Sequence, residues 1–104
     1  MYVTNIHITA VDNELYILAA QNPTTTSEIC HLKSGYNKPV DYSVIPQSIL
    51  PHGNYTLIMI GINWGGPQAF KVTLTDSNNV NTDYVALPNT TIGANWTVAI
   101  PITV

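Results

Sequence analysis

Charged residues are scarce in this sequence, making up 9% of the 104 residues, whereas typical soluble domains contain about 25%. There is no arginine, and the three lysines, Lys33, Lys38 and Lys71, are scattered along the chain. A net charge of −3 gives no positive field for a phosphate backbone, and no guanidinium is available to clamp one. Nucleic acid is therefore not expected as a partner.

A second cysteine and long apolar runs are also absent. The lone Cys30 cannot form an intramolecular disulfide, and its apolar neighbours in SEICHL predict a buried, inert thiol. No apolar run is long enough for a membrane span, so we expect no membrane insertion. Met1 leads into YVTNIHITA without the basic and apolar regions of a signal peptide. This predicts a cytoplasmic protein or one exported by a non-classical route.

Helical periodicity is missing as well, whereas short runs rich in Val, Ile, Thr and Tyr recur between clusters of Asn, Gly, Pro and Asp. The pattern predicts a single all-β domain over residues 1–104. We expect an antiparallel β-sandwich of about eight strands, Ig-like or jelly-roll, with a small β-barrel as the alternative. The expected strands are 2–11, 14–20, 27–32, 41–46, 55–62, 68–76, 83–88 and 95–104, with a turn at Asp12 and Asn13 between the first two.

The apolar pattern also predicts where some strands lie. Segments 14–20 and 55–62 are apolar on both faces, which favours central positions, whereas prolines place 41–46 and 97–104 at edges. The phrase LPHGNYTL resembles the corner before a core strand in immunoglobulin-like and fibronectin-like sandwiches. This resemblance implies that the Tyr55 hydroxyl returns to the backbone upstream.

The titratable residues form no recognisable catalytic motif. His7, His31 and His52 are far apart and show none of the close spacings of zinc or hydrolytic sites. Nucleophile motifs such as G-x-S-x-G and phosphate-binding glycine loops are missing too. We therefore expect that the protein is not an enzyme and needs no cofactor.

The segment DSNNVNTD, residues 76–83, carries hard oxygen ligands of the kind that calcium prefers. Its spacing differs from that of an EF-hand, and Asn and Asp also dominate plain hairpin turns. We favour a simple turn and keep a calcium loop as the alternative. The ligands of that loop would be Asp76, Asn78, Asn79, Asn81 and Asp83.

In GINWGGPQAF, residues 61–70, Trp64 stands on a glycine-rich turn between two expected strands. Its indole either folds back as a plug of the core or forms an exposed platform for the C–H face of a sugar. In the second interpretation, amide side chains bond the sugar hydroxyls, and the loop SGYNKP contributes a second aromatic. The candidate ligand-binding residues are Asn63, Trp64, Gln68, Tyr36 and Asn37.

These features lead to two hypotheses of different classes. The first is a non-catalytic, lectin-like module that binds carbohydrate and acts as a homo-oligomer, since its expected edge strands carry almost no charge to block pairing. The alternative is a structural, self-assembling protein whose Asn- and Thr-rich strands pair with further copies in a fibre, shell or inclusion.

Overall fold

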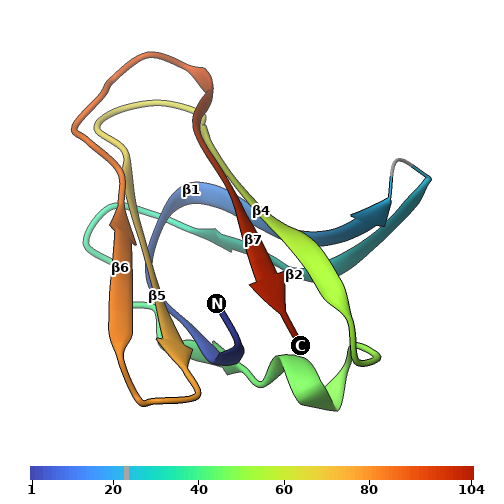
Figure 1. The fold of residues 1–104 in the computed structure, drawn as a ribbon. Coiled ribbons are helices and arrows are strands. Elements are labelled where there is room, and N and C mark those ends of the chain that lie inside the picture. The colour runs from blue at the N-terminus through green and yellow to red at the C-terminus, as the bar shows by residue number, and fades with distance from the viewer. Residues whose placement is uncertain (23) are drawn as a thin grey trace.

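A computed structural model of the chain describes residues 1–22 and 24–104. This part contains β-strands and one 3₁₀ turn, η1, but no α-helix, and no helix in it could cross a membrane. The all-β prediction is confirmed (Figure 1). The strands are β1 (Val3–Asn22), β2 (Thr25–Ser34), β3 (Tyr42–Val44), β4 (Asn54–Asn63), β5 (Ala69–Asp76), β6 (Asn81–Val85) and β7 (Gly93–Thr103), and η1 is Pro46–Ser48.

The strand β1 has 20 residues and replaces the first two strands expected from the sequence. The predicted turn at Asp12 and Asn13 is wrong, because the backbone remains in a ladder on both sides of it. Asp12 pairs with Ala69 of β5, and Asn13 pairs with Ser34 of β2. A hairpin would require the two halves of β1 to pair with each other, but each half has other partners.

All strands pair antiparallel in one seven-stranded sheet of order β6-β5-β1-β4-β7, and β2 and β3 also pair with β1. The sheet curls into a half-barrel, so that β5 and β6 face β4 and β7 (Figure 1). At one end, the amide of Thr103 donates to the carbonyl of Met1 at 2.8 Å. The eight-stranded sandwich is not confirmed, whereas the barrel alternative is compatible with this curl.

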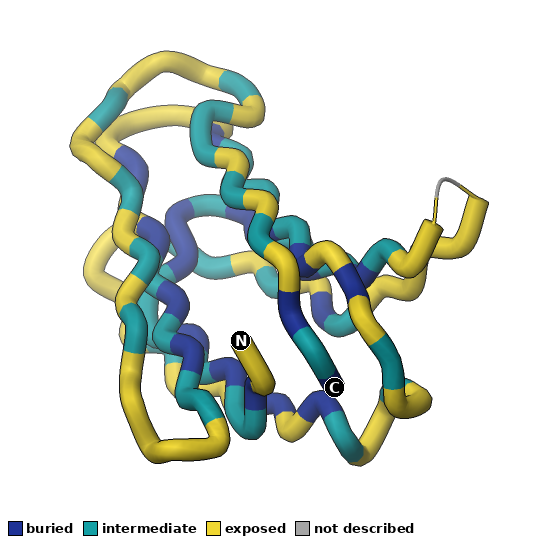
Figure 2. The backbone as a smooth tube through the Cα atoms, in the orientation of Figure 1, coloured by how far each residue is buried: buried dark blue, intermediate teal, exposed yellow. Residues whose placement is uncertain are grey.

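Alternation along the strands places the core inside the curl (Figure 2). In β5, Phe70, Val72 and Leu74 are buried, as the sequence predicts. The strand β4 lies between β1 and β7, and β3 and β7 are edges, which confirms those predictions. The fully buried side chains include Val3, Ile6, Ile8, Leu15, Ile17, Leu57, Met59, Phe70, Val72 and Leu74.

The corner before β4 also forms as expected. The Tyr55 hydroxyl donates a hydrogen bond of 2.8 Å to the carbonyl of Pro51. The ring of Tyr55 is buried, so this bond satisfies a polar group that would otherwise lose contact with water. The contact anchors the entry of β4 into the core.

Candidate functional site

Trp64 is an exposed aromatic side chain fixed in place by two hydrogen bonds. It is 59% exposed, so it does not fold back as a plug of the core. Its backbone N–H donates to Oδ1 of Asn13 at 2.7 Å, and its indole Nε1–H donates to Oε1 of Glu14 at 2.9 Å. Trp64 lies at the end of β4, just before the turn through Gly65 and Gly66, and β1 supplies both acceptors.

Glu14 is the centre of a polar cluster on the outer face of the sheet. The register pairs Glu14 with Lys33 and Tyr16 with His31, which places all four side chains on that face. His31 Nε2 bonds to Oε2 of Glu14, and Lys33 Nζ lies 3.8 Å from the same oxygen. The ring of His31 stacks on Tyr16 with centroids 4.0 Å apart.

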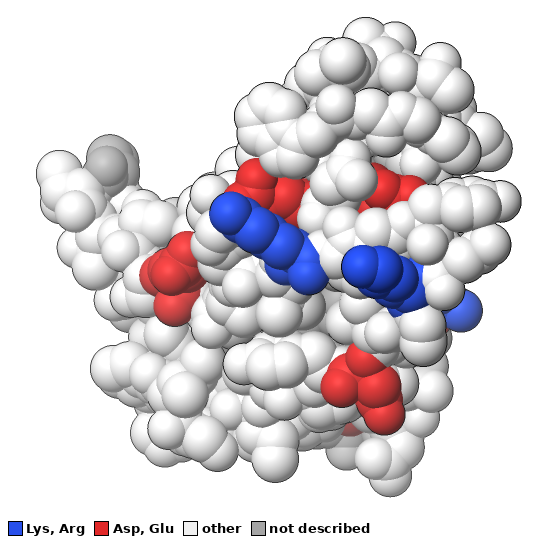
Figure 3. Space-filling model, turned by 180° about the vertical axis from the view of Figure 1, so that it is seen from behind, with Lys and Arg blue, Asp and Glu red and all other residues white. Residues whose placement is uncertain are grey.

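These contacts determine the charge of the cluster. The indole N–H of Trp64, followed by His31, lowers the pKa of Glu14 below its usual value, so the carboxylate is ionised at neutral pH. Burial and the nearby carboxylate raise the pKa of Tyr16, which keeps the phenol protonated. The cluster therefore holds an ionised, buried carboxylate beside the exposed indole of Trp64. The view from behind shows lysines and acidic side chains gathered on one face (Figure 3).

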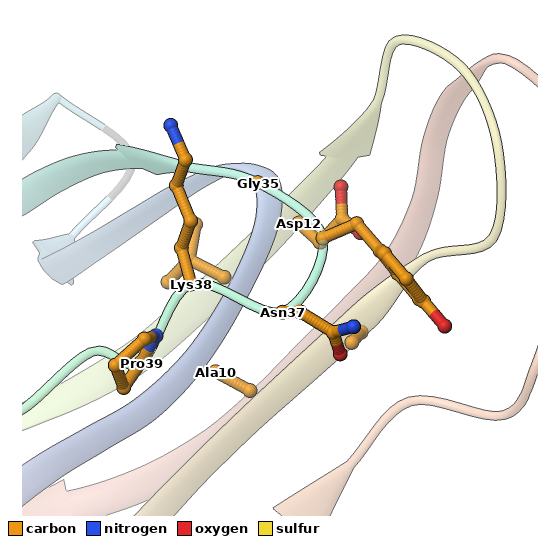
Figure 4. A pocket seen from close by; sticks show the side chains of 9 residues that line it. Ala10, Asp12, Gly35, Asn37, Lys38 and Pro39 are labelled. Atoms are coloured by element: carbon orange, nitrogen blue, oxygen red, sulfur yellow. The ribbon is translucent and has the colours of Figure 1, made fainter.

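A cavity of about 360 Å³ lies between β1, the loop after β2 and the start of β5 (Figure 4). Tyr36 and Asn37 line it, together with the buried carboxylate of Asp12. The remaining lining residues are Ala10, Val11, Gly35, Lys38, Pro39 and Ala69. Of the five residues proposed from the sequence, this cavity brings together Tyr36 and Asn37.

Asn63 is buried and holds the turn together, so it is not available to a ligand. Its Nδ2 donates to the carbonyls of Gly66 at 2.9 Å and Thr91 at 3.1 Å, and its Oδ1 accepts from the amide of Gly65 at 3.2 Å. The sequence prediction of Asn63 as a ligand contact is therefore corrected. Its amide bonds to the backbone, because a buried side-chain amide needs hydrogen-bond partners and the loop supplies them.

Gln68 lies in a different place from Tyr36 and Asn37. Its Nε2 donates to the carbonyl of Leu87 at 2.8 Å, while its Oε1 is buried without a partner among the described residues. It lines a second cavity, of about 450 Å³, with Trp96, Asn95 and the loop after β6. The five proposed residues therefore do not form one site. Trp64 is exposed and Asn63 is buried. Tyr36 and Asn37 line the first cavity, and Gln68 lines the second.

Residues 76–83 form the turn between β5 and β6. The Oδ1 of Asp76 accepts the amides of Asn78 at 2.8 Å and Val80 at 3.0 Å, and Asn79 has a left-handed φ of 61°. Asp83 accepts the hydroxyl of Thr73 across the sheet at 2.6 Å. These contacts are those of a hairpin turn stabilised by its own side chains. In residues 1–22 and 24–104, no three His, Cys, Asp or Glu side chains cluster as metal ligands.

Sequence reasoning missed Glu14, His31 and Asp12 as members of a site. Only the register of β1 with β2 brings His31 to Glu14, and the available signal was the matched patterns E-x-Y and H-x-K on strands that pair. We found no family model, curated protein or solved structure that matches the chain. Its function has to be inferred from these residues.

Proposed function

We propose that the protein is a non-catalytic, lectin-like module that binds carbohydrate, with Trp64 as the stacking platform. The observation that carries this proposal is an indole that is 59% exposed and yet bonded through both its backbone and its ring nitrogen. The exposed face of this indole is available for contact with a ligand. A ligand with an apolar C–H face and polar edges fits this surface.

Two physical features support a sugar as that ligand. The bonds to Asn13 and Glu14 hold the indole in one orientation, so little side-chain entropy is lost when a ring stacks on it. Glu14, ionised at neutral pH and only 7% exposed, accepts from the Trp64 indole and bonds to His31, so it anchors the platform and does not itself face the ligand. Charged residues make up only 9% of the whole chain, which suits an uncharged ligand.

A glycan array with wild-type protein and Trp64→Ala tests this proposal. We expect wild type to bind a subset of glycans and Trp64→Ala to lose that binding, while Tyr42→Ala, which removes another exposed aromatic, keeps it. Repeating the array with a chelator tests the calcium alternative for residues 76–83. If wild type binds no glycan, or if Trp64→Ala binds as well as wild type, the proposal is wrong.

Folding controls separate a lost platform from a lost fold. Trp64→Ala should reduce the free energy of unfolding by about 1 kcal/mol, the usual value for one hydrogen bond. Trp96 is half-buried and stacks on Phe70 with centroids 5.6 Å apart. Trp96→Ala should therefore cost more, toward about 3 kcal/mol, the lower end for buried large aromatics.

A structural, self-assembling role is the second candidate, and the outer face of β4 favours it. Ile58, Ile60 and Ile62 alternate with the core residues, so they lie on the outer face, where they are only half-buried. The edge strand β7 adds no charged side chain that would prevent pairing. Both candidates involve a homo-oligomer.

Size-exclusion chromatography with light scattering distinguishes the two candidates. A closed oligomer of fixed mass supports the lectin-like module, because such modules use a defined number of subunits. Growth without a fixed end point supports the assembly protein. A monomer that persists at high micromolar concentration would contradict the homo-oligomer in both.

A further inference from the structure

We propose that the cavity lined by Asp12 and Tyr36 binds one neutral sugar ring, with the Asp12 carboxylate accepting two of its hydroxyls. This inference rests on the proposed carbohydrate function and assigns it a second contact site beside Trp64. Tyr36 and Asn37 of this cavity were expected from the sequence as ligand contacts, whereas Asp12 was not.

Small side chains create that room. Ala10 on β1, Gly35 and Pro39 in the loop, and Ala69 at the start of β5 leave a cavity of about 360 Å³ (Figure 4). Small-molecule sites typically measure about 300–1,000 Å³, so this cavity suits a ligand of one ring. It lies between three segments that are distant in the sequence, which gives it walls from both the sheet and the loop.

Asp12 supplies the carboxylate that lines this cavity. The residue is only 3% exposed. No hydrogen bond or ion pair from residues 1–22 or 24–104 reaches its carboxylate. Lys38 lines the same cavity, but its chain extends away from Asp12 (Figure 4). Its oxygens keep some access to the cavity, so a ligand there that supplies hydroxyl donors can replace water at the carboxylate.

The surrounding groups define the class of ligand. A carboxylate has two oxygens and accepts several hydrogen bonds, which suits adjacent hydroxyls on one ring. Tyr36 is 69% exposed and offers a ring face at the mouth, while Asn37, at a φ of 57°, supplies an amide donor and acceptor. Asp12 and Lys38 carry opposite charges, so the lining has no net charge and favours a neutral ligand.

The position of Asp12 links the cavity to the tryptophan platform. Asp12, Asn13 and Glu14 are consecutive in β1, and Trp64 bonds to the last two. Sugar units held at the cavity and at Trp64 would therefore lie against neighbouring residues of one strand. This arrangement suits a short oligosaccharide better than a single monosaccharide.

The test is a titration of ¹⁵N-labelled protein with D-glucose, D-galactose, D-mannose and N-acetyl-D-glucosamine, followed by NMR. For at least one sugar, we expect saturable shifts at the amides of Ala10 and Ala69. Asp12→Asn should weaken this binding by about tenfold or more, because a charged acceptor forms hydrogen bonds roughly twice as strong as a neutral one. Glu28→Gln removes the same charge from an exposed position and should leave binding unchanged.

A second variant addresses the shape of the cavity without changing charge. Ala69→Leu fills the space and should block binding at Ala10, with the spectrum otherwise that of a folded protein. If a sugar shifts the Trp64 indole signal but not Ala10 and Ala69, the cavity proposal is overturned while the carbohydrate function stands. If Asp12→Asn and Ala69→Leu bind like wild type, the cavity proposal is also overturned. If no sugar shifts either region, the cavity proposal is overturned, and the glycan array decides the carbohydrate function separately.

Discussion

Replacing Gly61 by alanine should destabilise the protein through a single steric contact. Gly61 lies on β4 with its Cα facing the core, between Leu15 of β1 and Trp96 of β7. A Cβ at this position would lie 2.7 Å from Cε2, 2.8 Å from Cδ2 and 2.9 Å from Cζ of Phe70. These distances are below any normal carbon–carbon contact, so the ring or the strand must move.

Phe70 has little freedom to move away. It is buried, and its ring stacks on Trp96 with an interplanar angle of 2°. Overpacking of this kind costs about 1–3 kcal/mol, and alanine returns about 0.5–1 kcal/mol because it restricts the unfolded chain more than glycine does. We expect a net loss of about 1–2 kcal/mol in the free energy of unfolding, with a fall in Tm of roughly 4–8 °C per kcal/mol.

Urea unfolding followed by fluorescence measures this loss, and Gly65→Ala is the matched control. A Cβ at Gly65 meets nothing within 4 Å, so that variant should be neutral or more stable by about 0.4–1 kcal/mol. Phe70→Leu in the Gly61→Ala background should cost less than in wild type, because the smaller side chain relieves the clash. Equal stability of Gly61→Ala and Gly65→Ala would refute the contact between Gly61 and Phe70.

Three further predictions follow from buried or bonded polar groups. The hydrogen-bond donors Trp64 and His31 lower the pKa of Glu14 in the folded chain. The ionised carboxylate therefore stabilises the fold fully above about pH 4.3, the pKa of glutamate in an unfolded chain. This stabilisation is lost as the pH falls through the lower pKa of the folded state. Glu14→Gln should therefore lower stability at pH 7 and progressively less below about pH 4; a constant difference in urea titrations would contradict this. Burial raises the pKa of Cys30 to about 11, so a thiol reagent at pH 8 should label it only on unfolding, and rapid labelling of native protein would count against its burial. Asn63→Ala should cost about 1–3 kcal/mol in thermal unfolding because loop carbonyls lose their donor, and an unchanged Tm would argue against that role.

Local patterns in the sequence predicted much of the fold. The two-sided apolar run in β4 indicated its central position, and alternation in β5 identified its buried face. The Tyr55 corner was identified from one short phrase. These features depend on neighbouring residues, which is why they can be read without the tertiary structure. The continuity of β1 was missed, because Asp12 and Asn13 are typical turn residues and only distant strands hold them in a ladder.

The candidate site was harder to predict than the fold. Trp64 and Tyr36 attract attention as aromatics on loops, but their exposure depends on packing. The bond from Trp64 to Glu14 joins residues 50 positions apart. Asn63 looked like a ligand contact because its type is common in sugar sites, yet loop carbonyls take its hydrogen bonds. Which side chains meet over such sequence separations depends on the register of the whole sheet.

The long strand β1 has a consequence for how the protein opens. It pairs with β3 and β5 over its first half and with β2 and β4 over its second half. If the strands of one half separated from β1, they would expose a strand that also pairs with the strands of the other half. Local openings should be confined to the edge strands β2, β3, β6 and β7 and to the loops after residue 34, while the amides of β1 exchange with solvent hydrogen only on global unfolding. The protein should thus behave as one cooperative unit despite its two differently paired halves.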